Sequence, residues 1–194
     1  MKKINTLCVY CGSSENVDRK YRAAAERLGA LMAKHGVRLV FGGGGVGLMG
    51  SVADAVLAGG GEAIGIMPDF LLDIEVGHRG VKQMITVDSM HARKQKMFDM
   101  ADAFVILPGG FGTLDETLEI LTWKQLRRHD KPILIVNVDG YWNPFLNLLD
   151  AIIEKGFARR KDTDLYTVVC TVEEILPALA TVPEPTFRTA SSEI

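Results

Sequence analysis

Short apolar runs alternate with amphipathic stretches along almost the whole chain. The runs predict seven strands, at residues 4–10, 38–41, 63–66, 83–87, 103–107, 133–138 and 166–170. Most of them are nearly continuous in apolar residues. That pattern is typical of strands in a parallel sheet that is covered by helices on both faces.

Between these runs, apolar residues recur at helical spacing and predict helices at 19–34, 48–58, 89–100, 113–128, 144–155 and 172–180. Gly36 follows the first helix as a C-terminal cap would. Strands alternating with helices predict a Rossmann-like α/β fold, with a doubly wound, mainly parallel sheet of about seven strands and helices on both faces. We expect residues 1–182 to form a single domain and residues 183–194 a flexible tail.

Composition narrows the range of functions. The 194 residues are 47% apolar and 24% charged, close to ordinary globular proteins, and the formal net charge is −2. This balance argues against non-specific binding to nucleic acid or to an anionic membrane, so neither partner is expected. No segment approaches the roughly 20 apolar residues of a membrane span, and the N-terminus lacks the apolar core of a signal peptide. We therefore expect a cytoplasmic protein.

Cys8 and Cys11 have the C-x-x-C spacing of redox pairs and zinc sites. They lie in and just after the first predicted strand, however, where residues three apart face opposite ways. Neither a second such pair nor a suitable histidine pair follows. We expect neither a metal site nor redox chemistry here.

Three predicted strands end in turns rich in small residues, at 11–14, 42–50 and 108–113. In open parallel sheets, ligands bind outside the carboxyl ends of strands, where the strand order reverses. The third turn fits a phosphate best, because it runs straight into a helix that Thr113 would begin with a hydroxyl. A tight strand-to-helix connection is the alternative for either glycine-rich turn. Neither matches a P-loop, and their spacing disfavours an ordinary NAD enzyme.

Glu116 has two interpretations. With Thr113 it forms the T-x-x-E spacing of a capping box, in which the glutamate bonds back to the first residues of its helix. Alternatively, its carboxylate lies one turn from a phosphate site, within reach of a ribose hydroxyl or of a water molecule at the anomeric carbon. The local pattern favours the capping box.

The predicted helix at 89–100 begins with basic residues, after Asp88 or Ser89 as a cap. Met90, Arg93 and Lys94 share one face at helical spacing. A solvated basic stretch is the ordinary interpretation. Cations near a helix N-terminus oppose the helix dipole, however, so a nearby anion would account for them better. His91 alone points to no function.

Two motifs together resemble the LONELY GUY family. They are Met-His-Ala-Arg-Lys at 90–94 and Gly-Gly-Phe-Gly-Thr-Leu-Asp-Glu at 109–116. Residues 9–14, 42–50, 52–55 and 123–126 also fit the family pattern. The resemblance covers nearly the whole chain and ends at about residue 180. Ala92 and Asp115 stand where the family often has glutamate.

The resemblance implies a cytokinin riboside 5′-monophosphate phosphoribohydrolase. Such an enzyme hydrolyses the N-glycosidic bond of N6-modified adenosine 5′-monophosphates to a free base and ribose 5-phosphate. The resemblance also implies catalytic roles for Arg93 and Glu116, a homodimer, and no metal or organic cofactor. The resemblance, together with the turns rich in small residues, indicates the expected substrate-binding positions. They are Ser13, Gly44, Glu75, Met90, Arg93, Lys94, Gly109, Gly110, Phe111, Gly112, Thr113, Leu114, Asp115, Glu116 and Thr122.

Two other functions stay open. One is a general AMP nucleosidase, with plain AMP as its main substrate. The other is a non-catalytic nucleotide-binding module. Arg93 and Glu116 together favour catalysis, because a pure phosphate binder would not need a carboxylate beside its anion.

Overall fold

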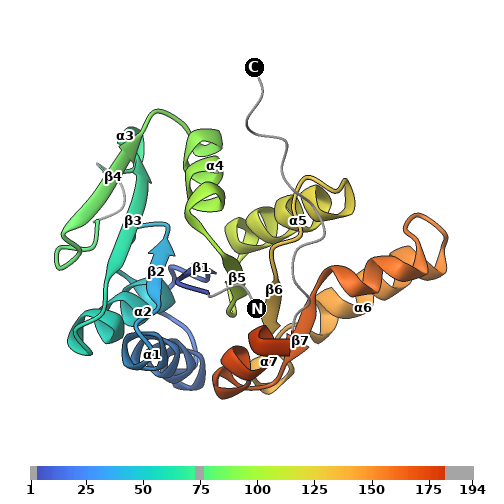
Figure 1. Cartoon of the computed structure of the whole chain (residues 1–194), viewed down its shortest axis with the longest axis horizontal. Coiled ribbons are helices and arrows are strands. Elements are labelled where there is room, and N and C mark those ends of the chain that lie inside the picture. The colour runs from blue at the N-terminus through green and yellow to red at the C-terminus, as the bar shows by residue number, and fades with distance from the viewer. Residues whose placement is uncertain (1–3, 73–76, 182–194) are drawn as a thin grey trace.

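The computed structural model describes residues 4–72 and 77–181 of the chain. Its centre is one seven-stranded sheet in the order β4-β3-β2-β1-β5-β6-β7, and every neighbouring pair is parallel (Figure 1). The strands are β1 (Thr6–Tyr10), β2 (Arg38–Phe41), β3 (Ala63–Pro68), β4 (Gln83–Val87), β5 (Ala103–Ile106), β6 (Ile133–Val136) and β7 (Thr167–Val169). The predicted doubly wound α/β fold is confirmed.

Helices cover both faces of the sheet (Figure 1). The α-helices are α1 (Arg19–Lys34), α2 (Gly47–Ala58), α3 (Asp69–Leu72), α4 (Met90–Met100), α5 (Phe111–Gln125), α6 (Asn143–Glu154) and α7 (Ile175–Thr181). The 3-10 helices are η1 (Val138–Gly140), η2 (Arg160–Leu165) and η3 (Val172–Glu174). Apolar residues of α1, α2 and α7 pack on one face, and those of α4, α5 and α6 pack on the other.

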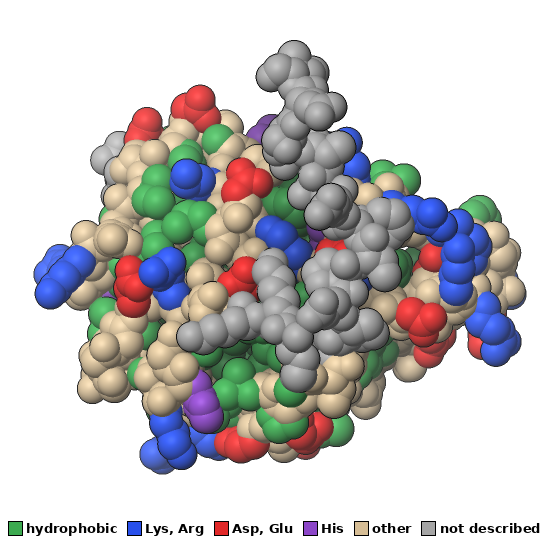
Figure 2. Space-filling model, in the orientation of Figure 1, with side chains coloured by type: hydrophobic (Ala, Val, Ile, Leu, Met, Phe, Trp, Pro, Cys, Tyr) green, Lys and Arg blue, Asp and Glu red, His purple; other side chains and the backbone are tan. Residues whose placement is uncertain are grey.

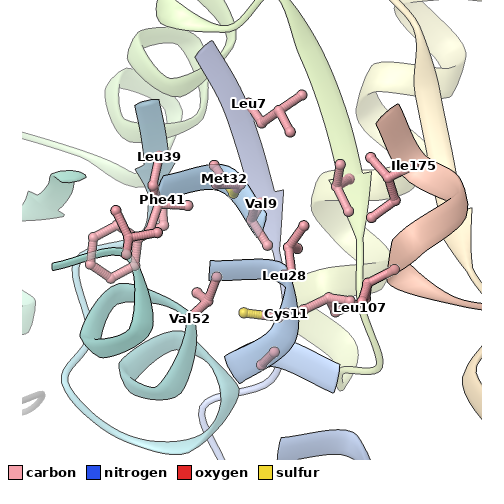
Figure 3. Close-up of a cluster of buried hydrophobic side chains, with 14 of the residues drawn as sticks. Leu7, Val9, Cys11, Leu28, Met32, Leu39, Phe41, Val52, Leu107 and Ile175 are labelled. Atoms are coloured by element: carbon pink, nitrogen blue, oxygen red, sulfur yellow. The ribbon is translucent and has the colours of Figure 1, made fainter. Parts of the chain in front are cut away.

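Alternation along each strand supplies the two cores. In β1, Leu7 and Val9 face the core beneath α1 and α2, as Figure 3 shows, while Cys8 and Tyr10 face the opposite core. Cys11 belongs to the same core as Leu7, so the two cysteines of the C-x-x-C pair lie on opposite faces of the sheet. This confirms the argument from strand geometry against their acting as a pair.

The structure differs from the predicted elements mainly at their ends. The predicted helix at 172–180 is divided into η3 and α7, and the short elements α3, η1 and η2 were not predicted. The helix α1 ends at Lys34 with His35 as its C-cap residue, and Gly36 follows at a φ of +64°, the left-handed conformation that favours glycine after a helix. The predicted tail at 183–194 lies outside the described residues, as does Glu75.

Acidic and basic side chains are interspersed over the face of the molecule that Figure 2 shows. A nucleotide would therefore have to meet a locally built anion site rather than a broadly basic surface. No helix in the described ranges combines the length and the apolar character that crossing a bilayer requires.

The strand order reverses between β1 and β5. From β1 the chain builds outward through β2, β3 and β4, and then it returns to the other side of β1 with β5, β6 and β7. The turns that follow β1 and β5 therefore flank a crevice at the carboxyl end of the sheet, where ligands bind in folds of this class.

Candidate active site

A cavity of about 600 Å³ opens at this reversal point. Its walls come from the turn after β1, the N-terminal part of α2, the start of α4, the turn from β5 into α5, and the segment after β6. Arg93 and Glu116 both line it. The fold therefore brings together the two predicted catalytic residues, which come from helices on either side of β5 in the chain.

The turn into α5 has no side-chain cap. Gly110 is the N-cap residue and Phe111 the first helical residue, so Thr113 and Glu116 occupy the third and sixth helical positions. The predicted helix start at 113 and the capping-box interpretation of Glu116 are therefore wrong, because the Gly109-Gly110 turn lets the helix begin two residues earlier. The first amides of α5 have no partner within the helix, which leaves them available to an anion.

Glycine at position 109 is required by close packing. A Cβ atom there would lie 2.1 Å from the hydroxyl oxygen of Thr113 and 2.9 Å from the amide nitrogen of Gly12. Thr113 is buried beneath the turn. The amide of Gly12 donates a 3.0 Å hydrogen bond to the carbonyl of Pro108 and so joins the turns after β1 and β5.

The glycine-rich turn at 42–50 has a packing role at its α2 end. Gly47 has a φ of +62°, and a Cβ atom there would lie 2.5 Å from the carbonyl carbon of Ser13. The amide of Leu48 donates a 2.9 Å hydrogen bond to the carbonyl of Gly12. Gly44 forms a β-bridge with Gly77 and is not among the described residues that line the cavity.

Arg93 is buried and held by backbone carbonyl groups. Its Nε donates to the carbonyl of Ile66 at 3.0 Å, and its Nη2 donates to the carbonyl of Gly42 at 2.7 Å. A Cβ atom on Gly42 would lie 2.0 Å from Nη2, so any other residue there would displace the guanidinium group from this position. Because neither acceptor is a carboxylate, these bonds fix the position of the positive charge without neutralising it.

Ser89 caps α4, since its hydroxyl accepts a 3.1 Å hydrogen bond from the amide of Ala92. This confirms one of the two predicted caps. Arg93 and Lys94 are only 7% and 8% exposed. The alternative of a solvated basic stretch is therefore wrong for both residues, because α4 turns this face into the protein.

Lys94 connects α4 to α5. Its ammonium group lies 3.1 Å from a carboxylate oxygen of Asp115 and 3.1 Å from one of Glu119. Burial opposes its charged form, but the hydrogen bonds to both carboxylates outweigh burial and raise its pKa. The ion pairs thus hold α5 against α4, close to the cavity.

We expect Lys94→Met to lower the free energy of unfolding by about 1–3 kcal/mol, because the largely buried carboxylate of Glu119 would lose its positively charged partner. Urea denaturation measures the change, and Lys96→Met, at an exposed position of the same helix, is the matched control. Equal stability of the two variants would show that the ion pairs of Lys94 contribute nothing.

Glu116 carries the most perturbed carboxyl group of the cavity. Burial raises its pKa to about 7, against the opposing effect of the positive charge on Arg93, while Asp115 adds a smaller upward contribution. Both protonation states are therefore populated near neutral pH. A carboxyl group with this property in a cleft is typical of catalytic acids and bases.

The same shift predicts a pH-dependent stability. Because the pKa of Glu116 is higher in the folded protein than in the unfolded chain, the stability it contributes is complete below about pH 4.5 and is lost as pH rises through 7. We expect Glu116→Gln to be about 2–3 kcal/mol more stable than wild type at pH 8.5, but nearly equal at pH 4.5. Denaturation at both pH values measures this. A stability difference that does not depend on pH would contradict the shifted pKa.

The other predicted site residues fall into three groups. Ser13, Met90, Gly109, Gly110, Phe111, Gly112, Thr113 and Asp115 line the cavity with Arg93 and Glu116. Lys94, Leu114 and Thr122 lie on α4 or α5 but, like Gly44, are not among the described lining residues. Glu75 lies outside the described residues.

Five residues that line the cavity lie outside both the predicted turns and the family motifs: Asn16, Val17, Asp18, Tyr21 and Tyr141. Three of them closely follow the predicted turn at 11–14, and Tyr21 lies at the start of α1, so the cavity extends beyond that turn into the helix. Tyr141 follows β6 and η1. No local pattern points to it, because only the strand order brings the end of β6 beside the turn after β5.

Comparisons with known proteins identify the relatives of this chain. Residues 49–179 match the family described as "Possible lysine decarboxylase". A cytokinin riboside 5′-monophosphate phosphoribohydrolase of Arabidopsis thaliana is 42% identical over 177 residues, which cover 91% of this chain and 82% of that protein. The corresponding Oryza sativa subsp. japonica protein is 42% identical over 183 residues, which cover 94% of this chain and 76% of that protein.

Solved structures support the fold. The molybdenum cofactor binding protein of Rippkaea orientalis has a TM-score of 0.71 at 20% identity, and the match covers 93% of this chain and 98% of that one. At this identity the likeness concerns the fold alone. The family model and the sequence relatives show the family, and the two motifs at 90–94 and 109–116 lie together at the cavity in this chain. The chain belongs to the LONELY GUY family, within the proteins described as possible lysine decarboxylases.

Proposed function

We propose that this protein hydrolyses the N-glycosidic bond of N6-modified adenosine 5′-monophosphates and releases the free base and ribose 5-phosphate. The relatives named as cytokinin riboside 5′-monophosphate phosphoribohydrolases support this substrate class. The single observation that carries the proposal is the shared cavity: an uncapped helix N-terminus, a carboxyl group with a pKa of about 7 and a buried guanidinium group line the same space.

The 5′-phosphate would bind at the N-terminus of α5. The free amides of the turn and the helix dipole both favour an anion there. Glu116 lies at the sixth position of the helix, between one and two turns further on. A ribose that extends from the bound phosphate along this helix would therefore bring its anomeric carbon and its hydroxyl groups toward the carboxylate.

Cleavage at the anomeric carbon develops positive charge on the ribose. The ionised carboxylate of Glu116 would stabilise that charge and orient the attacking water molecule. Arg93 would keep Glu116 ionised at a lower pH than burial alone allows, since its positive charge lowers the pKa of that group. The guanidinium group of Arg93, which its backbone hydrogen bonds fix in place, also lies at the cavity wall. There it can interact with the departing base or with the phosphate.

The test is release of free base and ribose 5-phosphate from N6-isopentenyl-AMP and from AMP by the wild-type protein. We expect turnover of both nucleotides, with a higher kcat/KM for the N6-modified one. A higher kcat/KM for AMP would instead favour a general AMP nucleosidase. Nucleotide binding without release of base from either nucleotide would favour a non-catalytic nucleotide-binding module.

We also propose that the protein is a homodimer that uses the outer face of α5. Phe111, Leu118 and Leu126 are 93%, 44% and 65% exposed, and their spacing places them on one side of α5 and its C-terminal cap. Exposed apolar residues that gather in this way are typical of an interface. Sedimentation equilibrium should give the mass of two chains, and Leu118→Glu should reduce it to one. A wild-type monomer would contradict the proposal.

A further inference from the structure

Tyr141 directly contacts the turn at 108–113, where the phosphate is proposed to bind. Its hydroxyl donates a 2.6 Å hydrogen bond to the carbonyl oxygen of Gly109, and its side chain lines the cavity. It follows η1, so it reaches the turn from the neighbouring β6 side of the sheet. The contact therefore joins two segments that are far apart in the sequence and unrelated by any motif.

With this bond, each of the three consecutive carbonyl groups that lead into α5 has a donor. Pro108 accepts from the amide of Gly12 at 3.0 Å, Gly109 from Tyr141, and Gly110 from the amide of Leu114 at 3.0 Å. In a trans peptide the carbonyl and the following amide point in opposite directions. Holding the Gly109 carbonyl toward Tyr141 thus directs the Gly110 amide away from Tyr141.

The peptide between Gly109 and Gly110 especially needs such a restraint. Neither residue has a side chain that limits rotation of this peptide plane, and both neighbouring dihedral angles are less restricted than in other residues. Rotation of this plane would reverse the directions of both the Gly109 carbonyl and the Gly110 amide. In contrast, the Pro108 and Gly110 carbonyls are held by backbone donors.

Tyr141 is itself held in place from several sides. Its ring packs edge to face against Tyr21 at 5.3 Å and against Trp142 at 4.9 Å between ring centroids. The 3-10 turn before it is tied to α1 by the ion pair between Lys20 and Asp139. The hydroxyl therefore approaches Gly109 from a packed ring rather than from a freely rotating side chain.

We propose that Tyr141 is a positioning residue for the 5′-phosphate, because its hydroxyl locks the Gly109–Gly110 peptide in the orientation that presents an amide to the anion. The inference rests on the proposed function in so far as the anion is the phosphate of a nucleotide. Tyr141 acts through the turn and contacts no reacting atom, so its effect belongs to phosphate binding and not to the chemical step.

The experiment compares Tyr141→Phe with wild type. The variant keeps the ring and its packing and removes only the hydroxyl. Tyr166→Phe is the matched control, since Tyr166 is half-buried just before β7 and is not among the described lining residues. Calorimetric titration measures the affinity for ribose 5-phosphate, AMP and adenosine, and steady-state kinetics with N6-isopentenyl-AMP separates KM from kcat.

We expect Tyr141→Phe to weaken the binding of ribose 5-phosphate and AMP by about three- to tenfold, the usual effect of one neutral hydrogen bond. KM should rise by a similar factor while kcat and adenosine affinity stay near the wild-type values. Tyr166→Phe should change none of these. Amide hydrogen exchange at residues 109–114 should become faster relative to the rest of the described chain in Tyr141→Phe and not in Tyr166→Phe, which separates release of the turn from a general loss of stability.

Unchanged affinity for ribose 5-phosphate would overturn the inference, as would an equal loss for AMP and adenosine. A wild-type protein that binds neither ribose 5-phosphate nor AMP would overturn both the inference and the proposed function. A wild-type protein that binds AMP but cleaves no nucleotide would refute the proposed function alone. The effect of Tyr141 would then still be decided by the titrations.

Discussion

Replacing Glu116 with glutamine should lower kcat for N6-isopentenyl-AMP by about 10³-fold, with a much smaller change in KM. The amide has almost the shape of the carboxyl group but carries no charge. It therefore cannot stabilise the positive charge of the transition state or accept a proton from water. In the proposed function the turn at 108–113 binds the phosphate and supplies most of the substrate affinity, so most of the loss should appear in the chemical step. Single-turnover assays measure it directly.

Glu119→Gln is the matched control for this variant. It makes the same chemical change on the same helix, but Glu119 pairs with Lys94 and is not among the described residues that line the cavity. We expect its kcat to stay within a few-fold of wild type. If Glu116→Gln behaved like this control, the carboxyl group would be part of the cavity wall without taking part in the reaction.

The pH dependence of the wild-type enzyme should reflect the same group. If the ionised carboxylate is the active form, kcat/KM rises with pH and levels off above the Glu116 pKa of about 7. The rise should be absent from the residual activity of Glu116→Gln. Activity that instead falls as pH increases through 7 would show that the protonated form is needed, with Glu116 acting as a general acid.

Arg93→Met should have the second largest effect, a loss of about 10²- to 10³-fold in kcat/KM. Methionine fills part of the same space but removes the positive charge and both hydrogen bonds to the carbonyls of Gly42 and Ile66. Without that charge, the pKa of Glu116 should rise above 7, so the pH–rate profile should shift upward. Initial rates between pH 6 and 9 test both effects.

Two controls separate charge from folding. Arg93→Lys keeps a positive charge but cannot bond to both carbonyls in the same geometry, so it should restore the pH profile better than the rate. Circular dichroism at the assay temperature establishes that each variant is folded, because unsatisfied buried carbonyls lower stability. A folded Arg93→Met variant with an unshifted pH profile would show that Arg93 does not act through Glu116.

Much of the architecture follows from the sequence by itself. Continuous apolar runs and helical periodicity are local patterns, so they predicted the seven strands and most of the helices, with errors mainly at their ends. The glycine-rich turns were found for the same reason. In the turn at 108–113, Gly109 is required chiefly by Thr113, a residue of the same turn, and after the first helix Gly36 is favoured by its own left-handed φ.

The tertiary structure decided what those residues do. Thr113 and Glu116 have the spacing of a capping box, and only the start of α5 at Phe111 excludes that role. Burial gives Glu116 its pKa, and it depends on helices and strands that no local pattern brings together.

Arg93 and Tyr141 show the same limit. Arg93 can be buried because Gly42, just after the end of β2, leaves space for its guanidinium group. Tyr141 reaches Gly109 because β6 lies beside β5. The sequence alone therefore determined which elements form and which turns can approach an anion. The order of the strands decided which side chains share a cavity, because electrostatic and packing interactions depend on distance in space and not on separation along the chain.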